Sequence, residues 1–113
     1  PIMEIKDIIQ TLEDIIRRYG LKPLYLDFTD ITLISRIGFS QEVFIQIYAN
    51  IKKEKINMAL VIAGGRIYGI DKEGGFYHEH PFENPVHHAD TKQIDIEGFV
   101  IKSLEILKKI KLL

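Results

Sequence analysis

Hydrophobic residues recur at steps of three and four over residues 3–19, which predicts an amphipathic helix with one apolar stripe. The stripe consists of Ile5, Ile8, Ile9, Leu12, Ile15, Ile16 and Tyr19. Glu4 and Asp7 lie in the first turn, where acidic groups suit the helix dipole. Gly20 supplies the stop signal.

Between Leu24 and Ile70 the hydrophobic period shortens to two, and β-branched residues are frequent, which predicts β-strands. The alternating segments are Leu24–Thr29, Ile31–Phe39, Val43–Asn50, Ile56–Ala63 and Arg66–Ile70. The links between them are short, with a polar turn at Lys52–Lys55 and a tight turn at Gly64-Gly65. Short links join antiparallel neighbours, because a parallel crossover needs about a dozen residues.

The end of the chain returns to a helical pattern, with Asp95 as the predicted N-cap. The apolar stripe of this helix comprises Val100, Ser103, Leu104, Leu107 and Ile110, with Ile96 and Phe99 at its entry. Ile101 and Ile106 are expected to lie off the stripe. This predicts burial of the helix on more than one side, or contact with a partner such as a second copy of the chain.

The order of elements predicts one α+β domain over residues 1–113. We expect an N-terminal helix, an antiparallel meander of four to five strands and a C-terminal helix, with both helices on one face of the sheet. The opposite face is then left as a solvent-exposed surface, a dimer surface or a working surface.

The composition narrows the class of protein further. The chain is 46% hydrophobic and 27% charged, as globular proteins are, and its apolar runs are far shorter than the roughly 20 residues of a membrane span. The absence of cysteine excludes disulfides, thiolate metal sites and a cysteine nucleophile. With no secretory signal visible, we expect a cytoplasmic protein that does not bind membranes. The 21 isoleucines against 4 alanines resemble the usage of thermophiles or AT-rich genomes.

All four histidines lie within residues 76–91, at His78, His80, His87 and His88. In an extended segment His78 and His80 point to one face and Glu79 to the other. Two imidazoles on one face can bind a divalent transition metal, with a third ligand from His87, His88 or Asp90. The net charge of −4 over residues 76–97 favours such a cation site.

Two other interpretations of these histidines remain open. In a metal-free site, one histidine acts as base and another as acid on a substrate hydroxyl. In a structural role, the histidines cap backbone groups, pair with acids or lie exposed. Arg66 and Tyr68 alternate on a strand that runs towards the histidines, so they are expected on one face, where they could stabilise a phosphate or an oxyanion.

The order of motifs over residues 43–110 resembles one family. Asp71 is followed by His78-Glu79-His80-Pro81, by the pair His87-His88 and by the helix from Asp95. This order is similar to that of TumE-type toxins, small α+β proteins of toxin–antitoxin pairs. The resemblance implies an RNA-directed toxin with a cognate antitoxin, and a site that includes His80, His87 and His88. A non-enzymatic domain that forms oligomers, such as a homodimer, is the remaining hypothesis.

Overall fold

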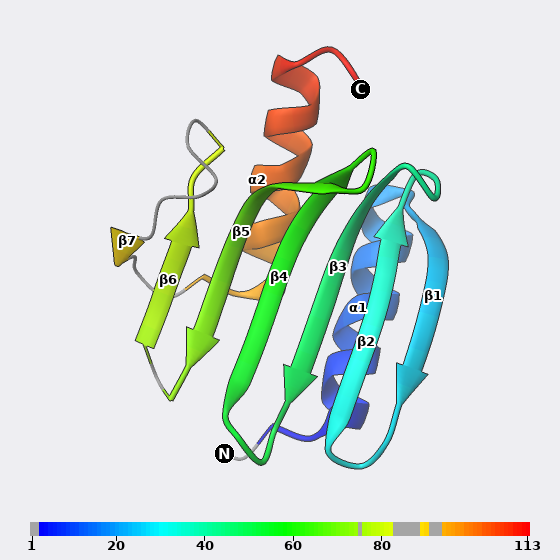
Figure 1. The fold of residues 1–113 in the computed structure, drawn as a ribbon. Coiled ribbons are helices and arrows are strands. Elements are labelled where there is room, and N and C mark those ends of the chain that lie inside the picture. The colour runs from blue at the N-terminus through cyan, green and yellow to red at the C-terminus, as the bar shows by residue number, and fades with distance from the viewer. Residues whose placement is uncertain (1–2, 75, 83–88, 91–93) are drawn as a thin grey trace.

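A computed structural model describes residues 3–74, 76–82, 89–90 and 94–113 (Figure 1). The elements in chain order are α1 (Ile5–Tyr19), β1 (Lys22–Phe28), β2 (Thr32–Gly38), β3 (Val43–Asn50), β4 (Lys55–Ile62), β5 (Gly65–Glu73), β6 (Phe76–His80), β7 (Ala89–Asp90) and α2 (Ile96–Lys109). Each strand pairs antiparallel with the next along the chain, so the sheet is a meander. The predicted α+β class is confirmed. The strand number is higher than predicted, because β6 and the two-residue β7 extend the sheet.

The ends of the two helices follow the predicted signals. The Asp7 carboxylate accepts a hydrogen bond from the backbone N–H of Glu4 at 3.0 Å, at the start of α1. Gly20 ends α1 in a left-handed conformation with φ of 64°, which glycine adopts without steric cost. Asp95 is the N-cap of α2, and its side chain accepts a hydrogen bond from the backbone N–H of Gly98 at 2.7 Å.

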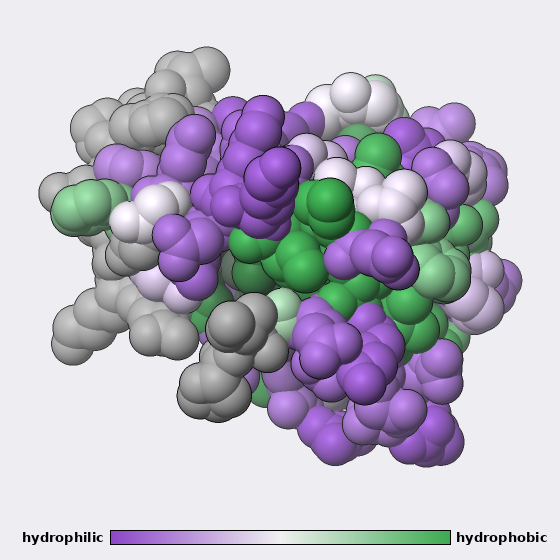
Figure 2. Space-filling model, turned by 90° about the horizontal axis from the view of Figure 1, so that it is seen from below, coloured by the Kyte–Doolittle hydropathy of each residue, from purple (hydrophilic) through white to green (hydrophobic). Residues whose placement is uncertain are grey.

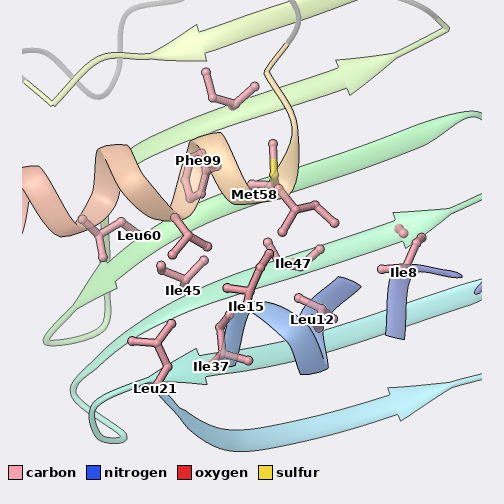
Figure 3. Close-up of a cluster of buried hydrophobic side chains, with 14 of the residues drawn as sticks. Ile8, Leu12, Ile15, Leu21, Ile37, Ile45, Ile47, Met58, Leu60 and Phe99 are labelled. Atoms are coloured by element: carbon pink, nitrogen blue, oxygen red, sulfur yellow. The ribbon is translucent and has the colours of Figure 1, made fainter. Parts of the chain in front are cut away.

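Both helices pack on the same face of the sheet, and the core lies between the two layers (Figures 1 and 3). The sheet contributes buried residues such as Leu33, Ile37, Ile45, Ile47, Leu60 and Ile70, and the helices contribute Ile8, Leu12, Ile15, Phe99, Val100 and Leu107. Each such side chain stabilises the fold by about 1.5–3 kcal/mol through the area it removes from water. This single core accounts for the confirmed placement of the helices.

Ile106, which was expected to lie off the main apolar stripe of α2, is 5% exposed and belongs to the core. The buried face of α2 is therefore wider than that stripe, in line with the first of the two predicted alternatives. The reason is its spacing, because Ile106 follows the buried Ser103 by three residues and so lies on the same side of the helix. Ile101 is 41% exposed, as expected for a residue off the stripe.

The hairpin between β4 and β5 turns one residue earlier than predicted. Ala63 and Gly64 both have positive φ, at 49° and 81°, which is the pattern of a two-residue type I′ turn. Gly65 is then the first residue of β5 rather than part of the turn.

Seen end-on from below, hydrophobic residues reach the surface among hydrophilic ones (Figure 2). A cavity of about 280 Å³ near the start of both helices is lined in part by Met3, Ile8, Ile56, Tyr77 and Ile94. The core is thus less completely covered here than in the middle of the domain. In the described part of the chain, neither helix is long and apolar enough to cross a membrane.

Candidate active site

The face of the sheet that carries no helix, here called the open face, is turned towards the viewer in Figure 1. On this face, Asp71 of β5 lies opposite Asn57 of β4 on one side and His78 of β6 on the other. One step along the strands, Gly69 lies between Ala59 and His80 in the same way. The pairing of β5 with β6 therefore brings His78, His80 and Asp71 together on the open face. His78 and His80 share a face, as predicted.

Arg66 and Tyr68 lie on opposite faces of the sheet, so the prediction that they share a face is wrong. The cause is a β-bulge in β5. Tyr68 pairs with Leu60 and Arg66 pairs with the next residue, Val61, so Ile67 is an extra residue in the ladder. The bulge interrupts the alternation of side chains. Arg66 reaches the histidines on the open face, whereas Tyr68 is directed towards α2.

His80 is held by two side chains although it lies on the open face, and it is only 3% exposed. Its Nε2 is 3.0 Å from Asp71 Oδ2, and its Nδ1 is 3.2 Å from Arg66 Nη2. A guanidinium can only donate hydrogen bonds, so Nδ1 must be the acceptor and Nε2 must carry the proton that it donates to Asp71. Arg66 Nη1 is also 3.9 Å from Asp71 Oδ2, which closes the Arg66–Asp71–His80 cluster.

Gly69 makes room for this cluster. A Cβ atom at Gly69 would lie 3.1 Å from Arg66 Cδ and 3.2 Å from the carbonyl oxygen of Met58. Both distances are tighter than ordinary contacts. The absence of a side chain at Gly69 therefore lets the Arg66 side chain lie across β5 on its way to His80.

A concavity of about 490 Å³ lies on the open face next to the cluster. Arg66 and Asp71 form part of its lining, and Gln46, Tyr48 and Asn57 contribute polar side chains from β3 and β4. Ala59 lies in the row between Gln46 and Gly69, so the two central positions of that row carry little or no side chain. The cluster thus adjoins a hollow large enough for a small ligand.

Tyr68, predicted as a catalytic residue, belongs to the core instead. It is 2% exposed, and its ring stacks on Phe99 of α2 with centroids 5.0 Å apart. Its hydroxyl donates to Glu79 Oε2 over a long 3.4 Å. Burial, together with the Glu79 carboxylate, raises the pKa of Tyr68 well above its ordinary value, so this phenol stays neutral.

The predicted metal ligands are His78, His80, His87 and Asp90, and the structure describes only some of them. His78 lies opposite Asp90 in the pairing of β6 with β7, but both ring nitrogens of His80 already have protein partners. Within the residues that the structure describes, no three His, Cys, Asp or Glu residues are grouped to hold a metal ion. His87 and His88 lie outside the described residues, so their roles as ligands or catalytic groups stay predictions.

The sequence analysis did not select Asp71 as a site residue, although the signal was present. The sequence Gly74-Gly75 is typical of a two-residue turn, and such a turn would pair residues symmetrically about itself. The observed pairs of Asp71 with His78 and of Gly69 with His80 have this register. Extending the strand past Ile70 would therefore have predicted the carboxylate beside the imidazoles.

In chemical terms, the Arg66–Asp71–His80 cluster combines a carboxylate that fixes an imidazole tautomer with a cation that can bind an anion. This combination suits proton transfer at an anionic substrate. No family model matches the chain, and neither the curated proteins nor the solved structures contain a significant match to it.

Proposed function

We propose that this protein is a ribonuclease-type enzyme, the toxin of a toxin–antitoxin pair, that cleaves RNA by acid–base chemistry on the open face. The observation that carries the proposal is the position of the His80 ring between the Asp71 carboxylate and the Arg66 guanidinium. A carboxylate, an imidazole and a guanidinium in contact are the groups that transfer a proton next to a phosphate. The resemblance to TumE-type toxins supports RNA as the substrate and an antitoxin as the partner.

Asp71 and Arg66 have separate tasks in this reaction. Asp71 accepts a hydrogen bond from the Nε2–H of His80, which keeps the proton on Nε2 and leaves Nδ1 as the basic nitrogen. Arg66 covers Nδ1 in the free protein, and its side chain is 42% exposed. A phosphate group binds a guanidinium more strongly than a neutral imidazole does. Substrate binding therefore draws Arg66 onto the phosphate and uncovers Nδ1.

The chemical step then follows the usual course of metal-free RNA cleavage. Nδ1 of His80 takes the proton of the ribose 2′-hydroxyl, and the 2′-oxygen attacks phosphorus. The bond from phosphorus to the 5′-oxygen breaks, which leaves a 2′,3′-cyclic phosphate, and the leaving 5′-oxygen takes a proton from an acid. His78 is a candidate for this acid, because it lies on the same face as His80 and opposite Asp71. His87 and His88 are the other candidates that the sequence offers.

The test measures cleavage of a fluorescent single-stranded RNA and growth arrest on expression. His80→Ala and Arg66→Ala should each lower the cleavage rate by about 10²-fold or more, because each removes a group that acts in the transition state. Arg17→Ala is the matched control, since it removes an arginine that pairs with an exposed aspartate on α1, away from the site. It should cleave RNA like the wild type.

Two results would contradict the proposal. One is a folded wild-type protein that neither cleaves RNA nor arrests growth. The other is a folded His80→Ala variant that cleaves as fast as the wild type. Activity that disappears in a chelator and returns with added zinc would replace the proposal with metal-dependent cleavage.

A further inference from the structure

We infer that the concavity next to the Arg66–Asp71–His80 cluster is a nucleobase subsite, which holds the base of a nucleotide whose phosphate contacts Arg66. The inference rests on the proposed function for its class of substrate. It adds a place on the open face where the protein distinguishes a nucleotide from a bare sugar phosphate.

The shape of the concavity follows from the register of four strands. Gln46, Ala59, Gly69 and His80 lie in one row across β3, β4, β5 and β6. Neighbouring strands are about 4.8 Å apart, so this row spans about 14 Å from Gln46 to His80. The two inner positions carry a methyl group and no side chain. The Arg66 side chain lies over Gly69, so the open floor of the concavity is at Ala59, and a flat ring fits there between Gln46 and Arg66.

The wall opposite His80 carries groups that suit a base. Tyr48 and Asn57 are directly opposite each other on β3 and β4, and both line the concavity with Gln46. Aromatic side chains stack on unpaired bases, and side-chain amides hydrogen-bond to their edges. Gln46 is already oriented, because its Oε1 accepts a hydrogen bond from Arg36 Nε at 2.9 Å.

Asn57 adds an amide side chain to the lining of the concavity. Its Oδ1 atom is buried, and no described residue donates a hydrogen bond to it. A buried acceptor without a donor lowers the stability of the fold, and an aliphatic residue at this strand position would avoid that cost. An amide offers a donor and an acceptor side by side, as the edges of the bases do. Asn57 is therefore better suited to bind a base than to stabilise the sheet.

The experiment records amide chemical shifts of the full chain during titration with adenosine 3′-monophosphate. The reference ligands are ribose 5-phosphate and inorganic phosphate. We expect the nucleotide to shift residues of β3, β4 and β5 on the open face, and to bind at least about tenfold more tightly than ribose 5-phosphate, because only the nucleotide carries a ring that can stack.

Two variants separate a binding role from a structural one. Ala59→Leu fills the concavity and should weaken nucleotide binding about tenfold, whereas Arg17→Ala on α1, away from the concavity, should bind like the wild type. Asn57→Val should also weaken binding, while its thermal midpoint stays equal to that of the wild type or rises. A merely structural Asn57 would give the reverse, with a lower midpoint and unchanged binding.

The outcomes separate this inference from the proposed function. If RNA is cleaved but ribose 5-phosphate binds as tightly as the nucleotide, the subsite is wrong and the cleavage site stands. If the nucleotide binds at the concavity and Ala59→Leu abolishes binding, while His80→Ala still cleaves RNA normally, the subsite stands and the proposed catalysis is wrong. Unchanged nucleotide affinity in both Ala59→Leu and Asn57→Val would overturn the inference.

Discussion

Strands β5 and β6 carry polar contacts on both of their faces, and the contacts on the two faces differ in what covers them. On the helix side, Tyr68 donates to Glu79 and is stacked under Phe99 of α2. On the open face, Asp71 and His80 meet next to a concavity, with no helix above them. The same pair of strands thus builds a packed contact on one side and an accessible contact on the other.

The comparison shows that cover, more than residue type, distinguishes the two faces of these strands. Tyr68 has the chemistry of an acid, but burial raises its pKa and keeps its proton in place. His80 is as buried as Tyr68, yet it lies on the open face, where the partly exposed side chain of Arg66 contacts its Nδ1. Tyr68, in contrast, is covered by the ring of Phe99 on α2.

The largest expected effect is on the helix side. Phe99→Ala removes a fully buried ring from the stack with Tyr68, and should lower the free energy of unfolding by about 3–5 kcal/mol. Urea denaturation followed by circular dichroism measures this loss. A loss below about 1 kcal/mol would show that α2 is not firmly packed on β5.

A smaller effect is expected on the open face. Asp71→Ala leaves the buried Nε2–H of His80 without its acceptor, which should cost about 1–3 kcal/mol of stability. RNA cleavage should fall by about 10²-fold, because the imidazole loses its fixed tautomer. Asp14→Ala removes the exposed partner of Arg17 on α1 and is the control, expected to change neither quantity. A variant with full activity despite the lost stability would make Asp71 purely structural.

The smallest effect at neutral pH is expected for Tyr68→Phe, which keeps the stacked ring and removes only a long hydrogen bond, worth about 1 kcal/mol or less. The pH dependence of the free energy of unfolding is more informative for this variant. The pKa of Tyr68 is raised above the value of 10.0 that applies to the unfolded chain. The resulting stabilisation is fully present below about pH 10, and is lost as the pH rises from there through the raised pKa. Wild-type protein should therefore lose more free energy of unfolding above pH 10 than Tyr68→Phe does. Parallel profiles for the two proteins would mean that Tyr68 is not buried in solution.

Much of the fold was predictable because local signals and burial agree. The three- and four-residue steps before Gly20 and the cap at Asp95 mark both helices, and alternation marks most of the sheet. The shared face of His78 and His80 follows from alternation alone. These features depend on short stretches of chain, which a sequence displays directly.

The site was predictable only in part, because it depends on pairing between strands. The extra residue Ile67 has no signal in the hydrophobic pattern, so strict alternation placed Arg66 beside Tyr68. Asp71 directly follows Ile70, where the hydrophobic alternation of its strand ends, and the register of β5 with β6 places it opposite His78. The hydrophobic period along one strand cannot show such contacts between strands.

The bulge at Ile67 has a wider consequence for this small domain. It changes the phase of β5 by one residue without changing the neighbours of the strand, so Arg66 and Asp71, an odd number of residues apart in one strand, lie on the same face. The strand pairing should therefore tolerate deletion of Ile67. A chain that lacked Ile67 would still pair Arg66 with Val61 and Tyr68 with Leu60. Arg66 and Tyr68 would keep their faces, and only the local twist that directs the guanidinium towards His80 would be lost.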